Sequence, residues 1–285
     1  MENKKTAIVL EGGGMRGAYT AGALSWLIDN NITSDNAYGI STGAVHLSNY
    51  LIKSKDLLFG LSTNYITDPR VVGIKPLLRC GRIVDYDFLF DKFLPSLGYD
   101  ISSLKNEKTD GYIGVYDMSV SKTVYISIHD MMYEEMKAAT SLPILGKVVK
   151  IGKRELLDGG ITKMIPIEQA VEDGCNANLV ISTKPAGYVR KPAKSIVVWF
   201  MRMFYHKCPQ ISEDYRVRHI NFEKQINMIK DLEKEKKAVY IYPTKTSNVT
   251  RLGGSREELE ELYELGRHDM EARKEEIFEL FGINA

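Results

Sequence analysis

Residues 6–43 decide the fold, and they read TAIVLEGGGMRGAYTAGALSWLIDNNITSDNAYGISTG. The apolar run at 6–11 predicts a buried strand, and the pattern after its glycine-rich turn predicts a helix over 16–30. A second short strand is expected over 36–40, followed by a helix over 42–53. Strands that alternate with helices in this way are typical of a mainly parallel sheet covered by helices. We therefore expect an α/β fold.

The second turn of this stretch has the pattern G-x-S-x-G, with Ser41 between Gly39 and Gly43. A serine on a tight turn between a strand and a helix holds its hydroxyl clear of the backbone, where it can attack a carbonyl. Serine is also common as an ordinary helix N-cap, so the motif alone leaves both interpretations open. Its position directly after a predicted strand favours a nucleophile.

The first turn is a glycine run whose notable members are Gly12, Gly13, Gly14, Arg16 and Gly17. A glycine-rich turn that opens a helix leaves several backbone N–H groups pointing at one spot, where they can hold negative charge. A purely structural turn needs fewer glycines and no arginine. The two turns together predict acyl transfer, with a nucleophile on one and an oxyanion site on the other.

The same glycines also match G-x-G-x-x-G, the fingerprint of dinucleotide-binding domains. That interpretation requires an acidic residue at the end of the second strand, to bind the ribose. Here the strand ends in Ser41, and Asp35 precedes it. An NAD- or FAD-binding oxidoreductase is therefore the weaker hypothesis.

Histidine is the usual partner of a nucleophilic serine, but none of the five histidines has the position that a triad requires. His46 lies one turn after Ser41, at a spacing that points away from the hydroxyl. Asp158 is the better candidate base, because it ends a predicted strand and is followed by Gly159 and Gly160. The glycines allow a close approach of the backbone, and a shielded carboxylate can accept the serine proton directly. In isolation, D-G is more often a simple turn.

The three motifs G-G-G-x-R-G, G-x-S-x-G and D-G-G, in this order, resemble those of the patatin-like phospholipases, which are serine acyl hydrolases with a Ser–Asp dyad. The resemblance extends over residues 6–183 and includes an A-[ST]-x-x-P block at 138–143. It is nearest to a bacterial branch with a short helical C-terminal region. One departure is Met164, which stands where many relatives have an asparagine two residues before the proline.

The resemblance implies a three-layer α/β/α hydrolase with a mainly parallel central sheet and a C-terminal helical extension. It implies that Ser41 is the nucleophile, that Asp158 is the base, and that Gly159 and Gly160 form the supporting loop. Glycines 39 and 43 shape the turn around the serine. The implied oxyanion hole consists of Gly12, Gly13, Gly14, Arg16 and Gly17. The expected substrate is a lipid acyl ester, with no metal and no organic cofactor. The alternative is a catalytically weak lipid- or acyl-binding regulator on the same fold.

Composition sets the remaining expectations. The chain of 285 residues has 38 basic and 37 acidic side chains, so no overall charge suggests nucleic acid. Its three cysteines are widely spaced and odd in number, which fits reduced thiols better than disulfides or a zinc site. With no signal peptide and no membrane-spanning run in the sequence, we expect a cytoplasmic protein. The oligomeric state is not predictable from these features.

We place a domain boundary near residue 187, giving a hydrolase domain at 1–187 and a mostly helical region at 188–285 packed on it. Within the second, residues 196–204 (IVVWFMRMF) form an apolar helix flanked by basic residues. Such a helix can lie on an anionic lipid surface, although core packing is the commoner role. The aromatic-rich stretch 65–91 either caps an acyl pocket or forms a connector with its own small core.

Overall fold

The computed structural model describes residues 4–81 and 84–283. At its centre lies an eight-stranded sheet with the order β5-β6-β3-β2-β1-β7-β8, and β4 pairs with β3 outside this path. The strands are β1 (Thr6–Leu10), β2 (Asn36–Ile40), β3 (Asp110–Asp117), β4 (Lys122–Ser127), β5 (Val149–Ile151), β6 (Arg154–Asp158), β7 (Ala177–Ile181) and β8 (Ala238–Ile241). Strands β3, β2, β1, β7 and β8 are parallel, whereas β4, β5 and β6 are antiparallel to their neighbours. The expected mainly parallel sheet is confirmed.

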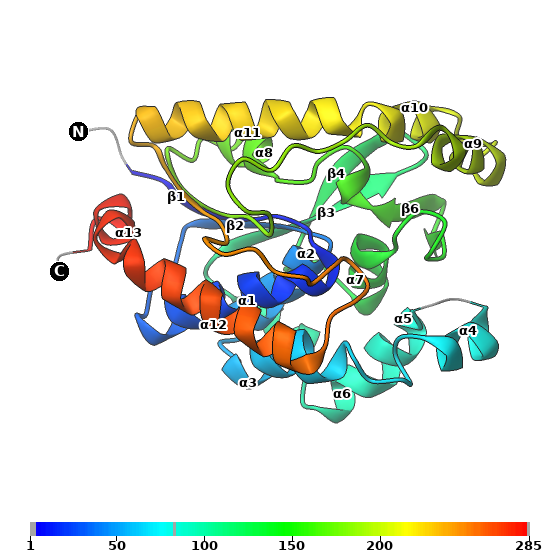
Figure 1. The fold of residues 1–285 in the computed structure, drawn as a ribbon, viewed down its shortest axis with the longest axis horizontal. Coiled ribbons are helices and arrows are strands. Elements are labelled where there is room, and N and C mark those ends of the chain that lie inside the picture. The colour runs from blue at the N-terminus through cyan, green and yellow to red at the C-terminus, as the bar shows by residue number, and fades with distance from the viewer. Residues whose placement is uncertain (1–3, 82–83, 284–285) are drawn as a thin grey trace.

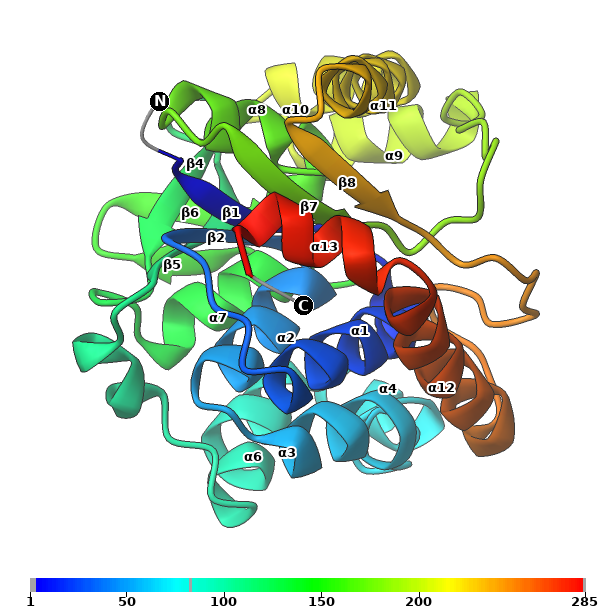
Figure 2. The ribbon, with the colours of Figure 1, turned by 90° about the vertical axis from the view of Figure 1, so that its left-hand side faces the viewer.

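Helices cover both faces of the sheet, giving the three layers seen in Figures 1 and 2. One face carries α1 (Gly17–Asp29), α2 (Thr42–Leu51), α7 (Tyr133–Thr140), α12 (Arg256–Ala272) and α13 (Lys274–Phe281). The other carries α8 (Ile167–Glu172), α10 (Gln210–Arg216) and α11 (Arg218–Lys234), with α9 (Ser195–Phe204) beside α10. Short helices α3 (Lys55–Gly60), α4 (Ile74–Cys80), α5 (Tyr86–Phe88) and α6 (Leu94–Ser96) lie outside the first layer. Single helical turns occur at Gly14–Arg16, Leu61–Tyr65, Leu89–Phe93, Ile101–Asn106 and Gly159–Ile161.

The central strand β1 shows why this sequence requires two helical layers. Successive side chains of a strand point to opposite faces, and all four of its last residues are fully buried. Ile8 and Leu10 belong to the core that includes α1, α2 and α12. Ala7 and Val9 belong to the core that includes α8 and α11. An uninterrupted apolar run is therefore the correct pattern for a strand buried on both faces.

Most predicted elements agree with the structure to within two residues, and the differences have local causes. Helix α2 ends at Leu51 rather than at residue 53, because Lys53 has a left-handed backbone with φ of 57°. Helix α7 begins at Tyr133, because Met132 is extended and its N–H is capped by the Glu135 carboxylate.

The C-terminal residues contribute to the same layers as the rest of the chain. Strand β8 extends the sheet by pairing with β7, as an edge strand, and α12 packs along α1 (Figure 1). Ser255 and Glu258 form a capping box at the start of α12. Gly282 ends α13 with φ of 67°. Because both parts of the chain contribute to the same layers, the domain boundary near residue 187 stays a prediction. Among the described residues, no helix has both the length and the apolar character that crossing a bilayer requires.

Candidate functional site

Ser41 lies on a strained turn between β2 and α2, at the carboxyl end of the parallel strands. Its backbone has φ of 57° and ψ of −125°, a combination that a non-glycine residue adopts only when its surroundings impose it. The turn is tight, because a Cβ on Gly39 would lie 2.6 Å from the carbonyl oxygen of Gly43. Although Ser41 occupies the N-cap position of α2, its side chain makes no capping hydrogen bond. Its hydroxyl is therefore not used to cap the helix.

The register of β3 brings Asp158 to the same place. Ile40 pairs with Gly114 on one side of β3, and Asp158 pairs with Val115 on the other side. Ser41 and Asp158 consequently flank one point of β3, although 117 positions separate them in the sequence. Both residues line one cavity, which the glycine run closes. The sequence motifs that we singled out thus meet in space.

The carboxyl group of Asp158 is buried, with only 2% of the residue exposed. Its Oδ1 accepts a hydrogen bond from the N–H of Gly160, at 2.7 Å. Its Oδ2 is buried and has no hydrogen-bond partner among the described residues. Burial raises the pKa of Asp158, and the nearby Ser41 hydroxyl and Gly160 N–H offset this only in part. A buried carboxylate with a raised pKa is a stronger base than a free one.

The glycine run supplies fewer unpaired amides than its length suggests. The N–H of Gly12 donates to the carbonyl of Met164 at 3.2 Å, and that of Gly17 donates within the helical turn. The N–H groups of Gly13 and Gly14 have no acceptor among the described residues. A Cβ on Gly12 would lie 2.9 Å from the Cβ of Ser41, so the run passes directly beside the serine. Among the glycines of the implied oxyanion hole, Gly13 and Gly14 therefore retain unpaired amides.

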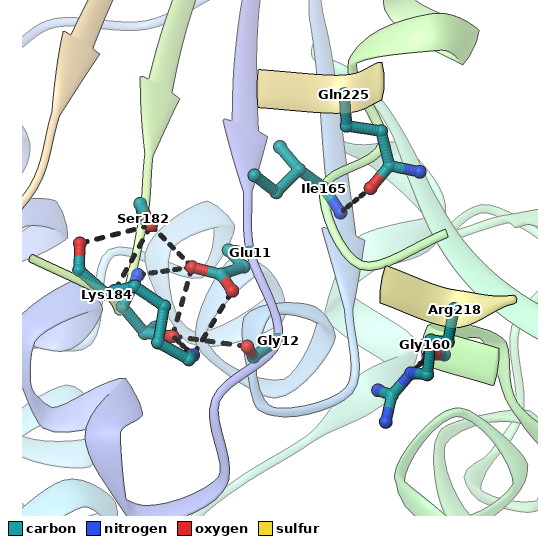
Figure 3. Close-up of polar contacts among 9 residues, drawn as sticks. Glu11, Gly12, Gly160, Ile165, Ser182, Lys184, Arg218 and Gln225 are labelled. Atoms are coloured by element: carbon teal, nitrogen blue, oxygen red, sulfur yellow. Dashed lines mark hydrogen bonds and ion pairs between the residues drawn. The ribbon is translucent and has the colours of Figure 1, made fainter. Parts of the chain in front are cut away.

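A buried polar network that the motifs did not predict fixes the glycine run (Figure 3). Glu11 is fully buried at the end of β1 and accepts hydrogen bonds from Ser182 Oγ and the N–H of Thr183. Its other oxygen forms an ion pair with Lys184 Nζ at 3.2 Å. Burial alone raises the pKa of Glu11, but Lys184 and these hydrogen bonds together bring it below its ordinary value. Thr183 also donates to the carbonyl of Gly12.

A second missed residue, Gln225 on α11, supports the loop that contains Met164. Its Oε1 accepts from the N–H of Ile165 at 3.2 Å (Figure 3), and its Nε2 donates to Glu168. A glutamine from the C-terminal region therefore supplies polar support for the loop in which the usual asparagine is replaced. No spacing in the sequence links positions 165 and 225, so only the packing of α11 reveals this contact.

An apolar cavity opens on the other side of Ser41. Part of its wall comes from residues within 61–72 and 84–90, several of which belong to the same core as α1 and α2. The side chains that line it include Met15, Val45, His46, Leu61, Ile66, Val72, Tyr86, Leu89, Phe90 and Leu142. The aromatic-rich stretch 65–91 therefore contributes directly to the surroundings of Ser41.

The histidines do not complete a triad in the described residues. His46 is buried on α2, and burial lowers its pKa to about 4, so it is neutral near pH 7. His129 contacts Asp110 and the carbonyl of Leu104, away from the serine. The remaining three lie in the C-terminal region and do not line the cavity.

Two family models match parts of the chain. Residues 8–171, more than half of the chain, match the family model described as patatin-like phospholipase. Residues 208–282 match a domain of unknown function (DUF6363). YjjU of Escherichia coli (strain K12), an uncharacterised protein, is 23% identical over 273 residues, which are 92% of this chain and 75% of YjjU. The crystal structure of VipD from Legionella pneumophila aligns with 98% of this chain and 67% of VipD, at 12% identity and a TM-score of 0.46.

Proposed function

The chain belongs to the patatin-like phospholipase family, and we propose that it is a serine acyl hydrolase that cleaves lipid acyl esters through Ser41 and Asp158. One observation carries the proposal. The strained serine and the buried carboxylate line one cavity, with the unpaired amides of Gly13 and Gly14 beside them.

Each group has a defined part in a two-step reaction. The Oγ of Ser41 attacks the acyl carbonyl while the carboxylate of Asp158 accepts its proton. The N–H groups of Gly13 and Gly14 hydrogen-bond the oxyanion that forms. The proton then passes from Asp158 to the departing alcohol, leaving an acyl-enzyme. Asp158 next takes a proton from water, which attacks the acyl group, and then returns this proton to the Oγ of Ser41 as the fatty acid departs. The apolar cavity beside Ser41 accommodates the acyl chain.

A labelling experiment separates this function from acyl binding without turnover. We expect a fluorophosphonate probe to modify the wild-type protein and not Ser41→Ala, and we expect fatty acid release from a panel of acyl glycerols and phospholipids. A wild-type protein that stays unlabelled and releases no fatty acid contradicts the proposal and favours a lipid- or acyl-binding regulator.

Helix α9 supports a further part of the proposal, contact with a membrane surface. Five of its large apolar side chains are exposed: Ile196, Trp199, Phe200, Met203 and Phe204. Only Met201 on this helix is fully buried, so core packing does not account for the apolar pattern. Val197 and Phe200 line a cavity that also contains Asp158 and Arg218, so the helix lies beside the reacting groups. The cytoplasmic location stays a prediction.

We expect the double variant Trp199→Ser/Phe200→Ser to lose most of its binding to vesicles of phosphatidylcholine with phosphatidylglycerol. Removing two exposed aromatic groups from an interfacial helix deletes the apolar area that would enter the lipid. Co-sedimentation measures the bound fraction, and Ile283→Ser is the control, because this exposed apolar residue follows α13, at the opposite end of the molecule from α9 (Figure 1). Equal binding of both variants and the wild type would exclude α9 as the contact.

A further inference from the structure

Four arginine side chains line the cavity that contains Ser41 and Asp158. They are Arg16, Arg190, Arg218 and Arg251. Only Arg16 belongs to the glycine run. The other three lie outside the segment that matches the family model, on the loop before α9, at the start of α11 and on the loop before α12. The C-terminal region therefore brings three positive charges to the site.

These charges have little compensation in the protein. Among the described residues, none of the four guanidinium groups has a carboxylate within 4.0 Å. Glu11, the nearby buried acid, is already paired with Lys184. Asp158 is the remaining carboxylate of the cavity. The Nε atoms of Arg16 and Arg190 are buried without a hydrogen-bond partner. All four arginines are partly buried, and charges withdrawn from water are ordinarily paired, so this excess is unusual.

The arginines also disfavour one another's charge. Burial, together with the neighbouring Arg190 and Arg251, lowers the pKa of Arg218 to about 10, although Tyr215 and Asp158 act in the opposite direction. Burial likewise lowers the pKa of Arg16; Glu11 offsets this only in part, and Arg251 and Arg190 act in the same direction as burial. Because like charges at close range cost free energy, a bound anion would stabilise the cluster.

Uncharged contacts hold the guanidinium groups in place without neutralising them. The Nε of Arg218 donates to the carbonyl of Gly160 (Figure 3), and the N–H of Gly160 donates to Asp158. Arg218 also lies over the ring of Tyr215, at 5.3 Å from its centroid. Arg190 lies over the ring of Phe222 at 5.1 Å. The planar faces are thus occupied by aromatic rings, and guanidinium edges are well suited to bind phosphate oxygens in pairs.

We propose that Arg190, Arg218 and Arg251, with Arg16, form a phosphate-binding subsite beside Ser41, so that the substrate is an acyl ester with a phosphate group near the scissile bond. The substrate part of this inference rests on the proposed function. The binding part does not, because it requires no turnover. The phosphate could belong to a lipid head group or be free in solution, and the ligands below distinguish these sources.

Binding is measured by calorimetry in the Ser41→Ala protein, with hexanoyl glycerol phosphate, hexanoyl glycerol and inorganic phosphate as ligands. We expect the acyl glycerol phosphate to bind about tenfold or more tightly than the neutral acyl glycerol, as charge-assisted hydrogen bonds imply. Equal affinity of the two overturns the inference. Inorganic phosphate that binds as tightly as the acyl glycerol phosphate overturns the substrate part and leaves a site for free phosphate.

Two substitutions and a matched control test whether the arginines cause the preference for the phosphate ligand. Arg190→Gln and Arg251→Gln should each lower the preference for the phosphate ligand about tenfold. Arg216→Gln, on the same C-terminal region but paired with Glu213 at the surface, should not change it. Thermal melting confirms folding, and Arg190→Lys, which keeps the charge without the paired edge, should retain part of the preference. Variants that fold and keep the full preference overturn the assignment.

Turnover by the protein with Ser41 intact separates the two proposals. The expected result is a ratio of kcat/KM, phosphate ester over neutral ester, that falls about tenfold in Arg190→Gln. Hydrolysis without any preference for the phosphate ester overturns the subsite and leaves the hydrolase. Phosphate-dependent binding without hydrolysis of any ester supports the subsite and overturns the hydrolase.

Discussion

We expect Ser41→Ala and Asp158→Asn each to lower kcat/KM for ester hydrolysis by about 10³-fold or more, as is found when members of a catalytic unit are removed. Alanine removes the attacking oxygen. Asparagine keeps the shape of Asp158 and its hydrogen bond from Gly160, but it cannot accept a proton. Steady-state release of p-nitrophenol from a soluble acyl ester measures both losses. Ser103→Ala and Asp130→Asn, which change exposed residues elsewhere, are the matched controls.

We also predict the stability of the Asp158→Asn variant, and the expected result differs from that of a variant that loses structure. The raised pKa of Asp158 means that the fold prefers the protonated form, so the carboxylate present at neutral pH destabilises it. Replacing it by a neutral isostere should leave the melting temperature equal or higher. An inactive variant with a lower melting temperature would point to a structural role. Retention of activity would point to another base.

The sequence motifs identified the parts of the site that depend on local geometry. A serine between Gly39 and Gly43, directly after a strand, requires a tight turn, and the structure has that turn at Ser41. The burial of β1 on both faces follows equally from its uninterrupted apolar run. These features are readable because residues close in sequence determine them.

The parts of the site that could not be predicted from the sequence depend on contacts between residues that are far apart in the chain. Gln225 reaches Ile165, and Arg218 reaches Gly160, only because α11 lies across the second face of the sheet. Arg251 arrives from the loop before α12, where its carbonyl also accepts the N–H of Met15. The sequence shows basic residues in the C-terminal region, but it does not show that three of them lie around the cavity of Ser41. No periodicity of the sequence indicates which loop packs against which strand end.

Helices α1 and α12 pack so closely that replacing a glycine between them by alanine should destabilise the protein, the reverse of its ordinary effect in a helix. A Cβ on Gly22 of α1 would lie 1.9 Å from the carbonyl oxygen of Tyr263 on α12. A Cβ on Gly266 of α12 would lie 2.2 Å from the carbonyl oxygen of Tyr19. Buried hydrogen bonds also join the helices, with Tyr19 donating to Asp269 at 3.0 Å. The two glycines therefore set the distance between the helices.

Gly22→Ala should accordingly destabilise the protein, although alanine normally stabilises a helix interior by about 1 kcal/mol relative to glycine. Backbone atoms cannot move aside as a side chain can, so α12 must shift, at a cost of about 1–3 kcal/mol or more. Urea unfolding measures the loss, and Ala272→Gly on the exposed end of α12 calibrates the effect of propensity alone. The shift should also displace Arg251 and lower esterase activity. A more stable Gly22→Ala protein would show that α1 and α12 do not pack as closely as described.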